Sequence, residues 1–291
     1  IQMIVTTILL LTSGIYLWSY TGSEFSFSFI NKKNPHLLSF EHVPNYTAGI
    51  TFFVAVAATN LFHQGNWQRV YAAKNNNILV KSLLISFFVI IPIVFFMGFC
   101  GLVAISVDPN VVPDLGFFSL LFKDQTEFLS LIIIILGLSL TVSTVDTLVN
   151  AVSSLVVVDG KATFNIKSKV DFLKLSKYFI IILSIIAFFI ASKGYSVLYL
   201  FLLADLFCCA FVLTVFYSFY NKKMSEKTAF TSILIGLIGG FLLFPAPDFS
   251  KSLLVGVILP IEFFPIFVTQ SLLFLSFVVA TILPVLIWKL R

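Results

Sequence analysis

Long stretches of apolar residues constrain the fold of this chain more than any other feature. The hydrocarbon core of a bilayer is about 30 Å thick, so a spanning helix needs about 20 apolar residues. Eight stretches approach this length, covering residues 1–20, 47–66, 81–106, 128–158, 176–192, 196–220, 228–245 and 265–288. They are too continuous for the alternating strands of roughly ten residues that build a membrane barrel. The sequence therefore predicts an all-α, polytopic membrane helix bundle with about eight transmembrane helices.

The composition excludes most soluble functions. Only 11% of the 291 residues are charged and 59% are hydrophobic, whereas a soluble domain carries about 25% charged residues. The net charge of +5 comes from basic residues scattered among short loops, so we expect no nucleic-acid partner. The sequence has no nucleophile or phosphate-binding motif, and its cysteines lie in apolar stretches. We therefore expect neither an enzyme nor a zinc site.

Charges in the loops predict the orientation of the helices, because Lys and Arg accumulate on the cytoplasmic side of a membrane. Basic residues follow the second, fourth, sixth and eighth stretches, and acidic residues occupy the loops between them. The first helix then runs outward and the C-terminus is cytoplasmic. Because the chain begins inside an apolar stretch without an initiator Met, we expect it to lack its N-terminal part.

Three shorter features carry predictions of their own. Residues from Asp108 to Phe122 suit a short helix at the membrane interface. Pro260 and Glu262 interrupt the segment from Ser252 to Phe264, so we expect it to be re-entrant or interfacial on the outer side. Gly236 and Gly240 form a GxxxG pattern that is typical of close helix packing.

A polar stripe marks the fourth stretch. Ser139, Ser143, Asp146, Asn150 and Ser153 recur every three or four residues, Ser154 follows directly, and all six share one helix face. An unsatisfied polar group in hydrocarbon costs several kcal/mol, so we expect the stripe to face protein or water. The hydroxyls of Ser143 and Thr144 are hard ligands that suit a small hard cation. Alternatively, such hydroxyls bond to the preceding turn or pack against a neighbouring helix.

Acidic residues inside membrane helices are functional candidates, because they are costly to bury. Asp146 lies within the polar stripe, and Asp205 lies well inside the sixth stretch. Asp205 could bind an amine of the substrate, a second cation or a gating residue. A purely structural role, paired with another residue of the protein, is an equal alternative.

Two motifs resemble those of the sodium/solute symporter family. Ser143-Thr144-Val145-Asp146-Thr147, followed by Asn150 and Asp159, is similar to the eighth core helix of that family. The stretch Gly65-Asn66-Trp67-Gln68-Arg69-Val70-Tyr71-Ala72-Ala73-Lys74 is similar to its cytoplasmic QR-x-x-AAK segment, between the sixth and seventh core helices. The motifs occur in the expected order, and the resemblance extends across the chain.

The resemblance implies a site and an architecture. Ser143 and Thr144 would hold sodium through their hydroxyls, and Leu140 through its backbone carbonyl. Thr59 and Asn60 would contact the substrate, although interhelical hydrogen bonds are an equal alternative for them. Residues 1–291 would form one transmembrane domain: residues 1–20 end a first repeat, 47–220 form the second five-helix repeat of the leucine-transporter type, and 221–291 add two peripheral helices.

The function expected from these features is sodium-coupled symport of a small organic solute across the plasma membrane by alternating access. Sodium ions, the solute, the lipid bilayer and the missing N-terminal half of the chain are the expected partners. Asp205 joins Thr59 and Asn60 as a substrate candidate, and Asp146, Ser139 and Asn150 are candidates for the ion pathway or coupling. The alternative is a symporter-like sensor domain coupled to a signalling module, because a fold alone does not fix function.

Overall fold

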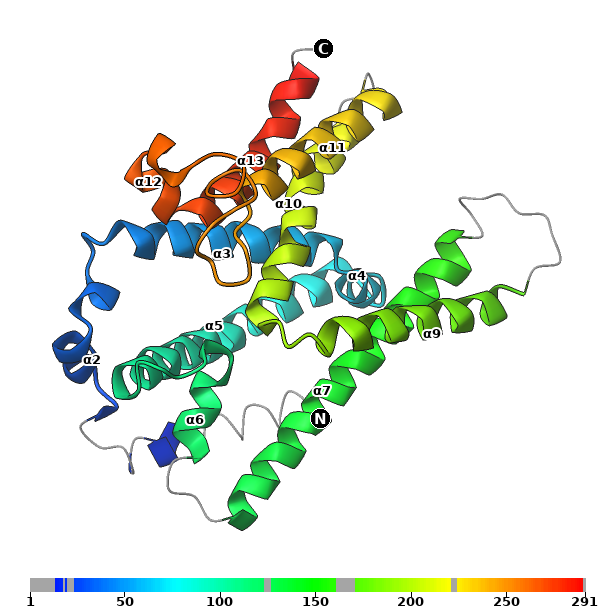
Figure 1. Ribbon diagram of the computed structural model, residues 1–291. Coiled ribbons are helices and arrows are strands. Elements are labelled where there is room, and N and C mark those ends of the chain that lie inside the picture. Colours follow the sequence, from blue (N-terminus) through cyan, green and yellow to red (C-terminus); the bar gives the residue numbers. More distant parts are fainter. Residues whose placement is uncertain are drawn as a thin grey trace. The chain divides into compact units, whose positions relative to one another are not determined.

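The structure, a computed structural model, describes residues 14–17, 19, 24–122, 127–160, 171–220 and 224–289. Within these residues the secondary structure is helical, apart from turns and two isolated β-bridges (Figure 1). Six helices of the described part are long and apolar enough to span a bilayer, and the bent pair α3 and α4 meets the same criteria jointly, as a broken span or a re-entrant loop. The predicted helical membrane bundle is confirmed. The first predicted span, residues 1–20, lies mostly outside the described residues.

The helices fall into two compact units, which are described separately. Unit 1 contains α2 (Phe27–Lys33), α4 (Gln64–Tyr71), α5 (Asn76–Val107), α6 (Gly116–Phe122), α7 (Glu127–Ser154) and α9 (Phe172–Ala191). Unit 2 contains α3 (Val43–Phe62), α10 (Val197–Tyr220), α11 (Glu226–Leu243), α12 (Ile266–Gln270) and α13 (Leu272–Lys289). Short helical turns add η2 (Pro35–Leu38), η3 (Pro113–Leu115) and η4 (Leu155–Asp159) to unit 1 and η5 (Ile261–Phe263) to unit 2.

Polar residues that flank the apolar stretches set where three of the long helices begin. Asn75 caps α5 by accepting a hydrogen bond from the Ile78 amide at 2.9 Å. Asp171 caps α9 and Ser225 caps α11 in the same way. Such caps satisfy amide groups that a helix leaves free at its N-terminus. These helices therefore start two to five residues before the predicted apolar spans at 81, 176 and 228.

Two predicted spans are interrupted. The span at 47–66 ends as α3 at Phe62, because His63 is extended and the chain restarts as the polar helix α4. The span at 265–288 breaks at Ser271, between α12 and α13. Polar residues lie at both breaks, and a hydropathy average over a whole span does not register them.

Unit 1 has a core around the C-terminal half of α5. The short helix expected between Asp108 and Phe122 is present as η3 and α6, and α6 packs against α5. The buried apolar residues of this cluster are Leu17, Phe25, Ile30, Cys100, Val103, Ala104, Leu120 and Leu121. In the same unit, α4 and α9 pack against α7.

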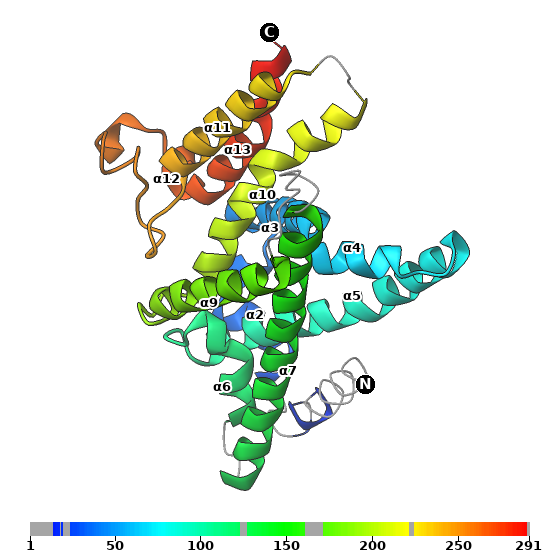
Figure 2. The same ribbon diagram turned by 90° about the vertical axis from the view of Figure 1, so that its right-hand side faces the viewer.

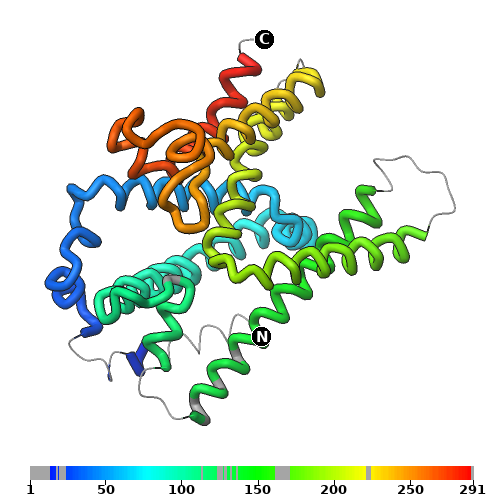
Figure 3. The backbone as a smooth tube through the Cα atoms, viewed as in Figure 1, coloured from blue at the N-terminus to red at the C-terminus, as the bar shows by residue number. Residues whose placement is uncertain are grey.

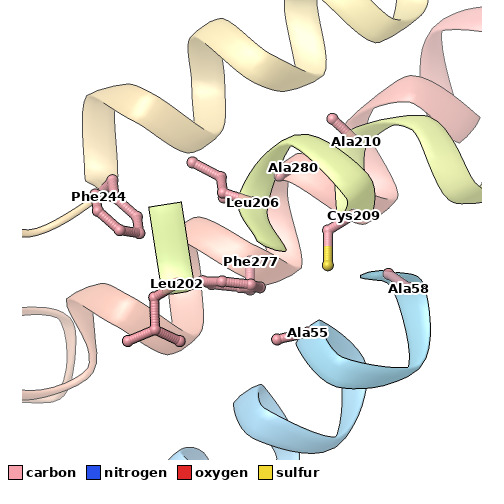
Figure 4. Close-up of a cluster of buried hydrophobic side chains, with 9 residues drawn as sticks. All are labelled: Ala55, Ala58, Leu202, Leu206, Cys209, Ala210, Phe244, Phe277 and Ala280. Atoms are coloured by element: carbon pink, nitrogen blue, oxygen red, sulfur yellow. The ribbon is translucent and has the colours of Figure 1, made fainter. Parts of the chain in front are cut away.

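Unit 2 is built around α10, which contacts α3, α11 and α13. Figure 4 shows the buried side chains where these helices meet: Ala55, Ala58, Leu202, Leu206, Cys209, Ala210, Phe244, Phe277 and Ala280. The alanines of α3 leave room for α10 to approach closely. The Phe277 ring is 1% exposed, and removing such a ring from a packed core costs about 3–5 kcal/mol.

Glycines bring α11 and α13 into close contact, and the two helices lie side by side (Figure 2). A Cβ atom on Gly236 would lie 2.4 Å from Pro284 Cγ. One on Gly240 would lie 2.9 Å from Ala280 Cβ. The packing role predicted for the GxxxG pattern is confirmed.

The segment between α11 and α12 forms no long helix (Figure 3). It turns back on α11, where the Leu254 amide donates to the Leu242 carbonyl at 2.8 Å. Two isolated bridges, Pro245 with Ser252 and Val255 with Leu259, hold its turns. This structure agrees with the prediction that residues from Ser252 to Phe264 do not form a spanning helix.

The glycine contact between α11 and α13 leads to a first prediction. Gly236→Ala should lower the free energy of unfolding by about 1–3 kcal/mol, because the added methyl group overpacks the contact with Pro284. The apparent melting temperature of the purified protein in detergent measures this change. Gly98→Ala is the matched control, since within the described part of the chain no atom other than those of its own stretch of α5 lies within 4 Å of its Cβ position, and it should leave stability unchanged or raise it. Equal melting temperatures for the two variants would contradict the assigned contact.

Candidate functional site

The predicted sodium ligands lie on α7, where hydroxyl groups bond to the preceding turn. These bonds run from Ser139 to Ile135 O at 2.8 Å, from Thr141 to Gly137 O at 2.9 Å, from Thr144 to Leu140 O at 3.0 Å and from Thr147 to Ser143 O at 3.1 Å. They match the alternative that the sequence left open for these hydroxyls. A hydroxyl that donates its hydrogen still keeps oxygen lone pairs, so this bonding leaves the oxygens able to accept a cation.

Two of the three predicted ligands are neighbours in space. The Leu140 carbonyl oxygen and Thr144 Oγ1 are 3.0 Å apart. This separation is the length of the hydrogen bond that joins the two atoms, and similar bonds occur at Thr141 and Thr147. It places two oxygen atoms side by side but does not by itself distinguish a cation site from ordinary helix bonding.

Part of the polar stripe lines an open groove of about 570 Å³ along α7. Ser139, Ser143 and Asp146 supply its polar atoms, and Ile135, Leu138 and Val142 its apolar lining. Asn150 is exposed about one turn further along the same helix. The groove thus gathers three of the predicted pathway and ligand residues on one face, as their spacing predicted.

The C-terminal end of the stripe meets another helix of unit 1. Ser153 Oγ lies 3.4 Å from Ser176 Oγ of α9, and Ser176 is 2% exposed. Beyond Ser154 the chain widens into the π-helical turn η4, a feature often found at functional sites. The sequence analysis did not single out Ser176, because a lone serine at the start of an apolar stretch does not indicate which way it faces.

In unit 2 the structure brings Thr59 and Asp205 together. Thr59 Oγ1 donates a hydrogen bond to Asp205 Oδ1 (α3 to α10). Asp205 is 2% exposed, although it is acidic, and it shares the buried face of α10 with Leu202 and Leu206. Among the described residues, no Lys, Arg or His forms an ion pair with it.

Asn60 is placed differently from its neighbour Thr59. It is exposed, and its amide donates to the Val56 carbonyl of its own helix at 2.8 Å. The predicted substrate residues therefore comprise the buried Asp205, the half-buried Thr59 that bonds to it, and the exposed Asn60 amide beside them. These residues belong to unit 2, and the predicted sodium ligands belong to unit 1.

The Thr59 hydroxyl gives a second prediction. Thr59→Val should lower the free energy of unfolding by about 1–3 kcal/mol, because it leaves a buried carboxyl without its hydrogen-bond donor. Thr59→Ser keeps the donor and should lose less. Thermal unfolding of the purified variants measures the difference. Thr47→Val is the control on the same helix, since the Thr47 hydroxyl bonds to carbonyls of its own helix. If Thr47→Val lost as much stability as Thr59→Val, the hydrogen bond between Thr59 and Asp205 would add nothing to the stability of the protein.

The chain was compared with protein families, curated proteins and solved structures. The model of the Sodium:solute symporter family matches residues 3–236. Comparison with curated proteins and with solved structures found no match. The matched range includes α3, α7 and α10, and so all the predicted site residues, whereas α13 lies beyond it. Because the match spans more than half of the 291 residues, the chain belongs to the sodium:solute symporter family.

Proposed function

We propose that this chain is part of a symporter that takes up a small organic solute with sodium by alternating access. Family membership supports the coupling to sodium. The observation that carries the site is the open groove along α7 that Ser139, Ser143 and Asp146 line with polar atoms. Thr144 is next to Ser143 in the chain, and its hydroxyl lies beside the Leu140 carbonyl oxygen. Further ligands from an upstream first repeat complete the site in this proposal.

Sodium entry provides the driving force. One positive charge that moves inward gains about 2.3 kcal/mol per 100 mV of membrane potential. An ion held by Leu140, Ser143 and Thr144 together with ligands of the upstream repeat favours the conformation that brings the two sets of oxygens together, and so shifts the population toward the state that binds solute. Ser139, Asp146 and Asn150 keep the path to this site polar.

The solute contacts are assigned to Thr59, Asn60 and Asp205, with Asp205 acting through the Thr59 hydroxyl that bonds to it. The exposed Asn60 amide offers both a donor and an acceptor. The half-buried Thr59 of α3, bonded to the buried Asp205 of α10, lies beside it in unit 2. The assignment places polar recognition at a helix that ends just beyond it, at Phe62. Discontinuous helices of this kind form the binding sites of many transporters.

The proposed location is the plasma membrane, with the C-terminus in the cytoplasm. The support is the alternation of basic and acidic loops along the sequence and the preference of Lys and Arg for the cytoplasmic side. Lys289 in the last turn of α13 fits this orientation.

The sodium ligands give a third prediction. Ser143→Ala and Thr144→Ala in the full chain should each raise the sodium concentration that half-saturates solute uptake by about tenfold, equivalent to about 1.4 kcal/mol of lost ion binding. Uptake of a panel of labelled solutes into expressing cells, measured over a sodium series, gives these values.

Thr141→Ala is the matched control, because Thr141 also bonds to the preceding turn of α7 but lies off the polar stripe. It should keep the sodium dependence of the unmodified protein. Unchanged sodium dependence in both Ser143→Ala and Thr144→Ala would overturn the assigned ligands. Sodium binding without uptake of any solute would instead favour a sensor.

A further inference from the structure

Asp205 is an acidic side chain in the core of unit 2 with a hydroxyl, and no cation, as its partner. It is 2% exposed and lies on the buried face of α10. Leu202 and Leu206 of the same face belong to the apolar cluster drawn in Figure 4. Thr59 donates to its Oδ1 atom, and Oδ2 makes no hydrogen bond with any described residue. The carboxyl group is thus held on one oxygen only.

The helices around Asp205 supply no compensating charge. On α10 itself, its titratable neighbours are the thiols of Cys208 and Cys209. Between Val43 and Phe62, α3 has no acidic or basic residue. The charged residues of α11 and α13 lie in end turns, Glu226 and Lys227 at the start of α11 and Lys289 at the end of α13. A charged Asp205 would therefore have no counter-charge among the described residues.

The surroundings of Asp205 determine which cation its carboxyl group can bind. An isolated buried carboxylate is far more costly than a neutral carboxyl group whose O–H lacks an acceptor, so such groups tend to become neutral. Sodium would need several oxygen ligands, and the pair offers one carboxyl and one hydroxyl group. A solute amine would need space beside a side chain that is 2% exposed. A proton needs only one oxygen atom.

We propose that Asp205 and Thr59 form a proton-binding site, and that the protein carries a proton on Asp205 during its transport cycle in addition to sodium. A hydronium ion of bulk water supplies the proton: one of its O–H bonds breaks, an O–H bond forms at Oδ2, and a water molecule leaves. The carboxylate becomes a neutral carboxyl group, while the Thr59 hydroxyl continues to donate to Oδ1. The half-buried Thr59 and Cys208 and the exposed Asn60 place the pair at the edge of the core, where a small displacement of α3 from α10 admits water.

The transport of the proton by this protein rests on the proposed function as a symporter. The binding of the proton by Asp205 does not. Infrared difference spectroscopy of the purified full chain in sodium-free buffer tests the binding directly, with the proton itself as the probe. The unmodified protein at neutral pH should show the C=O band of a protonated carboxyl group, which falls as the pH is raised. Asp205→Asn should lose this band. Thr59→Val should keep it at a higher frequency, because the carbonyl oxygen no longer accepts a hydrogen bond.

Asp248→Asn is the control. Hydrogen bonds from the Ser250 hydroxyl and amide lower the pKa of this exposed loop carboxyl, so Asp248 is ionised at neutral pH and its replacement should leave the band intact. Absence of the band at neutral pH, or its persistence in Asp205→Asn, would overturn the proton site. If Asp205→Asn does not fold, an unshifted band in Thr59→Val would overturn it.

Carriage is tested in proteoliposomes under a fixed sodium gradient. An imposed inward proton gradient should accelerate solute uptake by the unmodified protein and, equally, by the control variant Asp248→Asn. If uptake by the unmodified protein ignores the proton gradient, carriage is refuted even where the band is present. Loss of the sodium response alone is a failure of the sodium site and does not affect the infrared result.

Discussion

Hydrocarbon offers no hydrogen bonds, and this constraint governs where polar atoms occur in the structure. Backbone groups are satisfied within helices, and polar side chains must find partners inside the protein. The hydroxyls of α7 bond to carbonyls of their own helix, Ser153 meets Ser176 of α9, and Thr59 meets Asp205 of α10. Each candidate site is therefore a place where the chain gathers oxygen atoms that lipid cannot accommodate.

The existence of the helices followed from the apolar stretches, but their ends did not. Asn75 and Asp171 extend α5 and α9 beyond their apolar spans by capping them, and a hydropathy count excludes such polar residues. Around His63 the predicted helix was too long, because the apolar average of residues 47–66 concealed a change to extended backbone at this residue. Helix boundaries depend on single hydrogen bonds, whereas the predicted spans depended on sums over some twenty residues.

The candidate site was predictable where helical periodicity carries the information. Ser139, Ser143 and Asp146 recur at helical spacing, and the structure places them along one groove of α7. The Thr59 and Asp205 pair was not predictable as a pair, because its members are 146 residues apart in the chain. Nor did α10 reveal its buried face, since the helix is apolar on all sides and only the packing of α3, α11 and α13 distinguishes one side from another.

Pro284 lies within α13 and has no amide hydrogen, so the Ala280 carbonyl lacks the donor that would normally come from four residues ahead. A helix is most easily bent at such a point. Gly236 of α11 lies against this same turn, close enough that an added carbon atom would touch both Pro284 and the Ala280 oxygen. Because α11 packs against α13 at the turn that lacks this hydrogen bond, a bend of α13 at Pro284 towards α11 would displace α11 as well.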